Sequence, residues 1–342
     1  MPNESDVSLL DFLAGVEPQK PISHLNLSLM PLTGNGQRPV GYVLGAEAIE
    51  NGSLTITEVS EQGRVSELLA DNRAEQPVLL LDGEVLTGAK QHRVLNATLL
   101  LPAKATVKIP VSCVEYGRWR RTSRAFQSSH HSSTRLRALK ARDVGRNLRT
   151  RGTPTSDQRA VWNEVESCLE FTGTTSPTGA LTDSHAQRRE AIEQYVQALD
   201  YPEGARGVLV AVDGRFAVLD LFDKPATLQS VWPRLLSGYA LDALCGEAQR
   251  PRPLAVRRLR AALQYIAGVQ CQPCPTAGIG EDWRFESEAL VGQALVAEGT
   301  CIHLCAFPKG DARIPEPPRP ASDPPSRRAR QRRPDAPDMF AR

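Results

Sequence analysis

The sequence predicts an α+β fold with a β-rich antiparallel core in two halves, a helical insertion and a disordered C-terminal tail. Short apolar runs recur between Gly, Asn, Asp and Pro residues, which favours antiparallel strands over parallel βαβ units. The stretch 120–206 is instead basic and helical in its periodicity, and beyond residue 307 the Pro and Arg content rises sharply. The expected divisions are an N-terminal extension (1–24), a β-rich half (25–119), a basic helical insertion (120–206), a second half packed on the first (207–307) and the tail (308–342).

The first half is predicted to contain mainly strands. Asn51-Gly52 gives a plausible left-handed cap to a short helix over 46–50. Strands are expected at 25–32, 54–58, 65–69, 77–81, 94–101 and 105–111. The polar stretch 82–93 between two of them is expected to be a loop.

Helices dominate the insertion. One is expected over 134–150 and a second over 155–171, where Thr155 and Gln158 form a capping-box pattern. A third over 186–199 carries its large apolar residues on one face.

The second half opens with "GVLVAVDGRFAVLDLF", two apolar runs joined by Asp213-Gly214, which predicts a β-hairpin with a type I′ turn. A helix should start near Pro225 and be kinked or split at Pro233. An amphipathic helix over 255–267 and closing strands over 283–307, with a turn at Glu298-Gly299, complete the fold.

The distribution of charge and the cysteine content indicate which kinds of partner and which cellular compartment to expect. The net charge is +2, yet the segment 118–151 holds eleven Lys or Arg against one acid, which suggests an anionic partner. No apolar run reaches the roughly 18 residues that span a bilayer, so no membrane segment is expected. Seven cysteines without an export signal predict a cytoplasmic protein with mostly free thiols.

Polar residues in the stretch 82–119 predict a site for an anionic small molecule. Lys and Arg would hold a phosphate or carboxylate, amides would contact a base or ribose, and carboxylates or a thiol would do chemistry. The ligand-binding candidates are Lys90, Gln91, Arg93, Asn96, Ser112, Arg118 and Trp119, and the catalytic candidates are Glu84, Cys113 and Glu115. The alternatives are a buried hydrogen-bond network and, for Cys113, an inert buried thiol.

The later cysteines allow a zinc site as a minor alternative to free thiols. Its ligands would come from the C-x-x-C pair and from one face of a strand. They are Cys271, Cys274, Cys301, His303 and Cys305. The sequence otherwise identifies no cofactor, and it contains no P-loop, dinucleotide fingerprint, nucleophile elbow or zincin motif.

The run "LLLDGEVLTGAKQHRVLNATLLLPAKATVKIPVSCVEYGRW" resembles the ARG and rhodanese-phosphatase-superfamily-associated protein domain family, where ARG stands for ADP-ribosylglycohydrolase. The segments "VWPRLLSGYALDAL", "GIGEDWRFES" and "CIHLCAFP" are also similar to it, whereas His92 replaces the family's Asn. The resemblance implies a neighbourhood of ADP-ribose or nucleotide chemistry. We therefore expect a domain that binds or processes a nucleotide- or ADP-ribose-like anion. The alternative is a non-enzymatic module that binds nucleic acid or protein through 118–151, and the sequence leaves open whether the protein is an enzyme.

Overall fold

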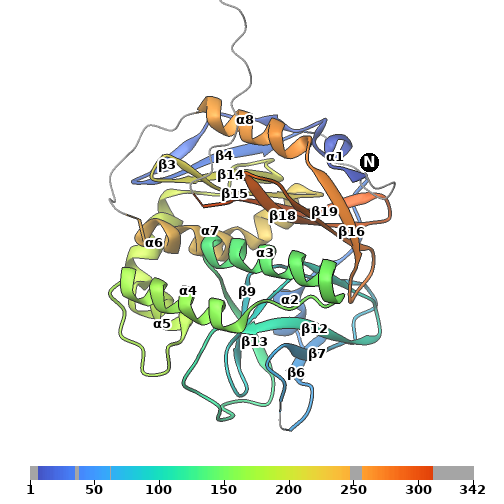
Figure 1. Cartoon of the computed structure of the whole chain (residues 1–342), viewed down its shortest axis with the longest axis vertical. Coiled ribbons are helices and arrows are strands. Elements are labelled where there is room, and N and C mark those ends of the chain that lie inside the picture. The colour runs from blue at the N-terminus through green and yellow to red at the C-terminus, as the bar shows by residue number, and fades with distance from the viewer. Residues whose placement is uncertain (1–6, 35–37, 62, 247–255, 311–342) are drawn as a thin grey trace, which may run out of the picture.

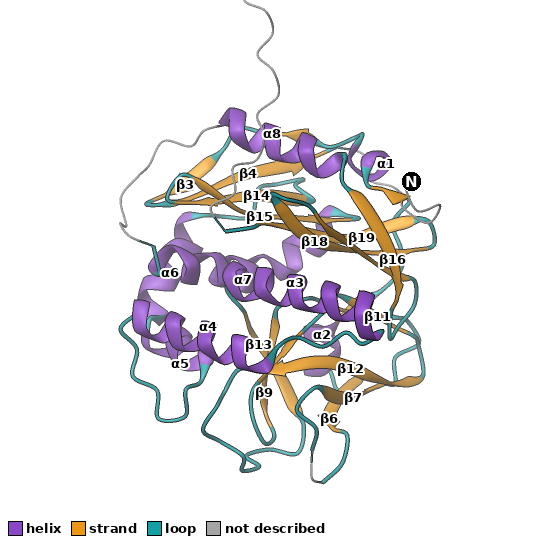
Figure 2. Ribbon diagram, in the orientation of Figure 1, coloured by secondary structure: helices purple, strands orange, loops and turns teal. Residues whose placement is uncertain are grey.

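The structure is a computed structural model that describes residues 7–34, 38–61, 63–246 and 256–310. Its α+β architecture confirms the predicted fold class. A large sheet forms one end of the molecule and smaller sheets form the other, with helices between them (Figures 1 and 2).

The large sheet joins both ends of the sequence. Its central hairpin is β14 (Gly207–Val212) and β15 (Arg215–Phe222), and the positive φ angles of Asp213 (53°) and Gly214 (72°) confirm the type I′ turn. The strand predicted at 25–32 is β4 (Leu27–Thr33), which pairs with β14 and so lies with the second half. The other strands of this sheet are β1 (Val7–Ser8), β2 (Glu17–Pro18), β3 (Ile22–His24), β16 (Gln270–Pro275), β17 (Glu281–Glu286), β18 (Leu290–Ala297) and β19 (Thr300–Pro308).

The smaller sheets correct three expectations. The stretch 82–93 is not a loop, because it forms β9 (Glu84–Gly88) and the first residue of β10 (Arg93–Leu95). The strand expected at 94–101 is divided, since β11 (Leu99–Leu101) joins a different sheet. The insertion over 120–206, expected to be helical, includes a strand, β13 (Phe126–His131), which pairs with β9. The remaining strands are β5 (Val43–Leu44), β6 (Leu54–Glu58), β7 (Glu67–Asn72), β8 (Val78–Leu80) and β12 (Ala105–Cys113).

The predicted helices form, with different ends. Asp157, rather than Thr155, caps α4 (Gln158–Phe171), because its carboxylate accepts the Arg159 and Ala160 N–H groups. Pro233 does not split α7 (Pro225–Leu244), since it lies on an exposed position of a helix whose other faces are buried. The others are α1 (Leu10–Leu13), α2 (Gly45–Glu50), α3 (Thr134–Arg151), α5 (Leu181–Gln187), α6 (Arg189–Ala198) and α8 (Val256–Ala267). None of the helices in the described ranges is long and apolar enough to cross a membrane.

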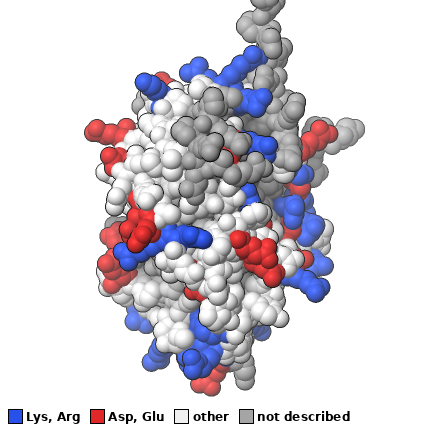
Figure 3. All heavy atoms as spheres, turned by 90° about the vertical axis from the view of Figure 1, so that its left-hand side faces the viewer, with Lys and Arg blue, Asp and Glu red and all other residues white. Residues whose placement is uncertain are grey.

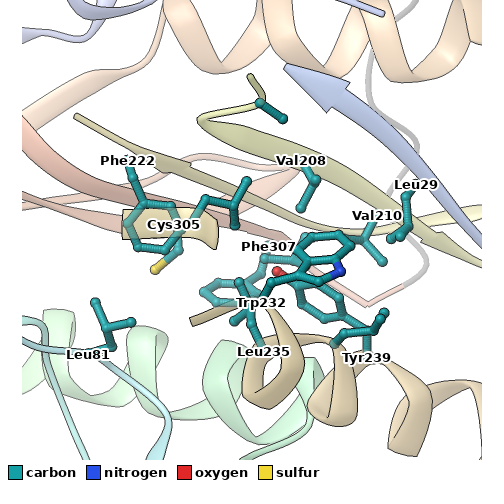
Figure 4. Close-up of a cluster of buried hydrophobic side chains, with 14 of the residues drawn as sticks. Leu29, Leu81, Val208, Val210, Phe222, Trp232, Leu235, Tyr239, Cys305 and Phe307 are labelled. Carbon is teal, nitrogen blue, oxygen red and sulfur yellow. The ribbon is translucent and has the colours of Figure 1, made fainter. Parts of the chain in front are cut away.

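One apolar cluster links the two ends of the molecule. Figure 4 shows side chains of β4 and β14 beside Trp232, Leu235 and Tyr239 of α7, and the same cluster includes Leu79 and Leu81 from the smaller sheets. Burial of this continuous cluster stabilises α7 between the sheets. The predicted tail lies outside the described residues except at 308–310, where Pro308 ends β19.

Candidate ligand-binding site

The turn at Gly83, before β9, places the carboxylates of Asp82 and Glu84 on different sides of the chain. Gly83 has φ +85°, and a Cβ added there would lie 2.7 Å from both Arg137 Cδ and His131 Cε1, so the turn requires glycine. Asp82, on one side, has no exposed surface and faces a buried ion network. Glu84, on the other side, lines a cavity.

The network around Asp82 pairs every charge that it buries. Asp82 accepts hydrogen bonds from Lys140 Nζ (2.9 Å) and Arg137 Nε (3.0 Å), and Arg137 donates two more to Asp220 (2.8 and 2.7 Å). All four side chains are fully buried. Two acids and two bases cancel, which offsets the large cost of removing them from water.

Asp220 extends this network into the large sheet. It accepts the Tyr239 hydroxyl proton (2.5 Å) and lies 3.1 Å from His303 Nε2, while the other His303 nitrogen lies 2.7 Å from Thr98 Oγ1. Burial would raise the pKa of Asp220, but Arg137 and His303 hold this pKa well below its ordinary value. Because its members come from both sheets and from α3 and α7, the network fixes the two ends of the molecule together.

The cavity beside Glu84 has a volume of about 350 Å³, within the range of small-molecule sites. Its walls come from α2, β8, β9, β13 and α7. Its polar lining includes Glu84, His130, His131, Ser230 and Arg234, with Glu47 and Glu50 of α2, and its apolar lining includes Leu44, Leu79, Leu81, Val231 and Pro233.

Glu84 is a buried carboxyl with few internal partners. The Ser128 hydroxyl donates to its Oε1 (2.5 Å), and the Leu81 N–H lies 3.5 Å from Oε2. Burial raises the pKa of Glu84 above its ordinary value, although Ser128 and the charge of Arg234 oppose the shift. A carboxyl with a raised pKa can exchange a proton closer to neutral pH than an exposed one does.

His131 has hydrogen-bonding capacity that the surrounding protein does not use. It is 4% exposed, and neither ring nitrogen has a hydrogen-bond partner in the described part of the chain. Burial lowers the pKa of His131 to about 3, so the imidazole is neutral and offers one donor and one acceptor. Unsatisfied groups of this kind are rare in native proteins because each one costs free energy.

Arg234 supplies a cation to the same cavity. Its side chain is half-buried on α7, and its guanidinium forms no hydrogen bond or ion pair with any residue that the structure describes. His130, also in the lining, stacks on His185 with ring centroids 4.3 Å apart. Burial, together with the charge of Arg234, lowers the pKa of His130. The cavity therefore combines a guanidinium that has no hydrogen-bond partner among the described residues, the neutral imidazole of His130 and the buried carboxyl of Glu84.

Comparison with protein families supports the resemblance found in the sequence. Residues 15–307 match the ARG and Rhodanese-Phosphatase-superfamily-associated Protein domain. The chain belongs to this family. The curated proteins and the solved structures gave no match. Within the family motif, Asp82 belongs to the buried ion network, whereas Glu84 lines the cavity.

Other motif residues of this family member form a rigid clamp. Glu115 accepts two hydrogen bonds from Arg118 (2.8 and 2.7 Å), one from the His92 N–H (3.0 Å) and one from the Thr178 hydroxyl (2.9 Å). Burial opposes ionisation, but these donors lower the pKa of Glu115. Its acceptor capacity is used within the fold, so Glu115 and Arg118 anchor the 115–118 segment rather than line the cavity.

A second group of motif residues attaches α4 to β12. The side-chain amide of Gln158 satisfies the backbone of Cys113 at the end of β12. Its Oε1 accepts the Cys113 N–H, and its Nε2 donates to the Cys113 carbonyl, both at 2.8 Å. Ser112 donates to Asn96 (2.7 Å), whose amide reaches the Pro154 carbonyl (3.3 Å). Burial raises the pKa of the Cys113 thiol to about 11, which disfavours the thiolate that a nucleophile needs.

Lys90 and Arg93 lie under the half-exposed ring of Trp119. Lys90 Nζ is 5.3 Å and Arg93 Cζ is 5.7 Å from the ring centroid. Arg93 is fully buried, donates to both oxygens of Gln91 (3.2 and 3.3 Å) and lies 3.7 Å from Glu58. The structure therefore brings these residues together, but it does not bring them into the cavity that Glu84 lines.

The cysteines considered for zinc lie in the large sheet. Cys271 and Cys274 are in β16, and Cys301 and Cys305 are in β19 with His303, which belongs to the ion network. None of the seven cysteines, all of which lie in the described ranges, forms a disulfide, and all are buried. Within the described ranges, no group of three or more His, Cys, Asp or Glu side chains could hold a metal ion.

Sequence reasoning did not select His130, His131 and Arg234. The adjacent histidines in "SSHHSS" were a usable signal, because such a pair in a strand places one ring on each face. Arg234 carried no local signal, since only the packing of α7 brings it to β9 and β13.

Proposed function

We propose that the protein binds a small phosphorylated ligand of the nucleotide or ADP-ribose class in the cavity lined by Glu84, His131 and Arg234. One observation carries the proposal: the Arg234 guanidinium, which has no hydrogen-bond partner among the described residues, shares a cavity with Glu84, a buried carboxyl with few internal partners. A ligand that satisfies both groups removes the cost of leaving them unpaired.

Each group has a distinct role in this proposal. Arg234 pairs with a phosphate through its planar fork of donors, and neutral His131 exchanges hydrogen bonds with a ribose hydroxyl. Leu44, Leu79 and Val231 contact the sugar or the base. The volume of about 350 Å³ suits a mononucleotide or one end of ADP-ribose better than a longer polymer.

Glu84 gives the site a capacity for acid–base chemistry. Its raised pKa favours the protonated carboxyl, which can donate to a leaving oxygen, and the ionised form can accept a proton. We infer that any reaction in this cavity passes through Glu84 rather than through Cys113, whose thiol lies outside the cavity and contacts the Val65 carbonyl.

A thermal-shift series tests binding. The probes are AMP, ribose 5-phosphate and ADP-ribose, each added to the wild type and to Arg234→Met and His131→Phe variants. A ligand at 100 times its dissociation constant should stabilise the wild type by about 2.7 kcal/mol. The variants should lose this stabilisation, whereas Arg189→Met, which removes an exposed ion pair with Glu193, should keep it. No response to any probe, or an unchanged response in Arg234→Met, contradicts the proposal.

The basic segment 118–151 gives less support to a nucleic-acid interface. Arg137 and Lys140 are buried in the ion network, Arg118 is held by Glu115, and Arg149 pairs with Glu286. On the face seen in Figure 3, Lys and Arg side chains are interspersed with Asp and Glu. A nucleic-acid site needs Lys and Arg side chains gathered on one open face. We therefore prefer ligand binding in the cavity to nucleic-acid binding as the function.

We also propose a cytoplasmic location. Seven buried cysteines that form no disulfide among the described residues suit a reducing compartment, where disulfides do not persist.

A further inference from the structure

A groove of about 750 Å³ lies between α3 and the β14–β15 hairpin. It shares no lining residue with the cavity of Glu84, His131 and Arg234. Its walls also include parts of α4, α7, β18 and the end of β19. The volume is larger than that of the cavity and again falls within the range of small-molecule sites.

One stripe of α3 forms a wall of this groove. Arg135, Ala138, Leu139 and Arg142 all line it, and their spacing of three and four residues places them on one helix face. The stripe is therefore apolar in the middle and cationic at both ends, and the two arginines are about 10 Å apart along the helix axis.

The opposite wall repeats this pattern. Phe216 and Ala217 of β15 give apolar surface, and Val212 of β14 extends it. Arg215 and Lys309 add two further cations to the lining. Lys309 is partly neutralised by Glu286, which lies 2.9 Å away.

The groove also contains an unused acceptor. Asp242 is 3% exposed, and its Oδ2 accepts the Thr134 N–H at 2.6 Å. Its Oδ1 is buried and accepts no hydrogen bond from the described residues. Glu164 lies in the same lining, and burial raises the pKa of both carboxyls, so they oppose an anion less than two ionised groups would. An occupant that carries a hydrogen-bond donor as well as negative charge would complement this lining.

We propose that this groove is a second ligand site that binds a nucleoside diphosphate. The phosphates pair with the arginines of the α3 stripe, the base lies against Phe216 and Leu139, and a ribose hydroxyl or base amino group donates to Asp242. The inference is independent of the function proposed for the Glu84 cavity, because the two sites have no residue in common.

Titration calorimetry of the full chain with ADP tests the proposal. The variants are Arg142→Met and Arg135→Met in the groove and Arg234→Met in the cavity. Arg146→Met is a matched control, because Arg146 lies on the same helix and pairs with Asp143 as Arg142 does, but does not line the groove. Each groove variant should weaken ADP binding by about tenfold or more, equivalent to 1.4 kcal/mol.

Arg146→Met should change this affinity less than about twofold, a difference below 0.5 kcal/mol. Because Arg234→Met removes the guanidinium of the cavity, the ADP binding that remains in this variant reports the groove alone. Failure of ADP to bind at millimolar concentration overturns the proposal. So does an equal loss in Arg142→Met and Arg146→Met, or loss of all ADP binding in Arg234→Met. A groove variant that unfolds is replaced by Phe216→Ala, for which the same weakening is expected.

Discussion

The ion network around Asp82 and the cavity around Glu84 begin two residues apart and have opposite character. Asp82 lies among donors that belong to the protein, and the charges of the network cancel. Glu84 lines a cavity with Arg234, whose guanidinium has no hydrogen-bond partner in the described chain. One turn thus contributes a carboxylate to the stability of the fold and another to a cavity that can receive a ligand.

The pKa values of these carboxyls move in opposite directions for the same reason. Burial alone would raise both, but Lys140 and Arg137 lower the pKa of Asp82, whereas Glu84 has no such pair and its pKa is raised. A buried polar group that the fold satisfies is evidence of structure, and one that the fold leaves unsatisfied points to a ligand. The predictions below test this distinction.

The largest expected effect follows from breaking the network. Asp220→Asn removes the charge that pairs with Arg137 and leaves a buried guanidinium undercompensated. We expect a loss of about 3–5 kcal/mol in the free energy of unfolding, measured with urea at neutral pH. Glu193→Gln, which breaks the exposed pair with Arg189, should cost far less, because water screens this pair. Similar losses in the two variants would show that the network does not hold the sheets together.

A second prediction concerns acid. Burial lowers the pKa values of His131 and His185 from 6.5 to about 3. Between these values the unfolded chain binds protons that the folded chain does not, so stability falls as the pH falls below 6.5. The two groups together should cost roughly 2 kcal/mol between pH 6 and pH 5.

Denaturation of the wild type and a His185→Gln variant at several pH values measures this effect. The variant should lose about half of the slope over the acid range, whatever its stability at pH 8. An unchanged slope would mean that His185 accepts a proton in the folded protein.

Sequence reasoning predicted elements whose signals are local. The Asp213-Gly214 turn specifies its hairpin through positive φ angles, and the apolar period of 158–171 specifies α4. It did not predict β9 and β13, because polar residues such as Glu84 and Ser128 form strands there only by pairing with each other's segments. The sequence also predicted only part of the candidate site, because only some of its residues carry a local signal. Glu84 lay in a recognisable motif, whereas Arg234 is brought to it by tertiary packing alone.

A smaller change in stability is expected on substitution of Glu84, and its sign should differ from that at Glu115. The pKa of Glu84 is raised, so its contribution to stability is present below the ordinary value of 4.5 and is lost as the pH rises through the folded value. At pH 7 Glu84→Gln should therefore stabilise the unliganded protein, on the order of 1 kcal/mol, as substitutions at strained functional groups often do. Urea unfolding at pH 7 measures the change.

Glu115→Gln is the matched comparison, because the pKa of Glu115 is lowered and its stabilising contribution is present at pH 7. That variant should be less stable by about 1–3 kcal/mol, since it weakens hydrogen bonds to a charged group. Destabilisation of equal size in both variants would make Glu84 a structural residue, and the cavity would lose its main argument.

The smallest effect is expected at the C-terminal end. If the network and the apolar clusters stabilise the fold, removal of residues 311–342, which are rich in Pro and charge, should change the free energy of unfolding by less than about 0.5 kcal/mol.

Truncation after Phe307, the boundary that the sequence suggests, should cost more. It removes Pro308 from β19, the backbone hydrogen bond from Lys309 to Ala289 (2.9 Å) and the pair between Lys309 and Glu286 (2.9 Å). The difference should be about 1 kcal/mol, close to one net hydrogen bond. Thermal melts of the two truncated chains measure it. A large loss on truncation after Gly310 would mean that the tail contributes contacts to the fold, and the division between a self-sufficient core and a dispensable end would be wrong.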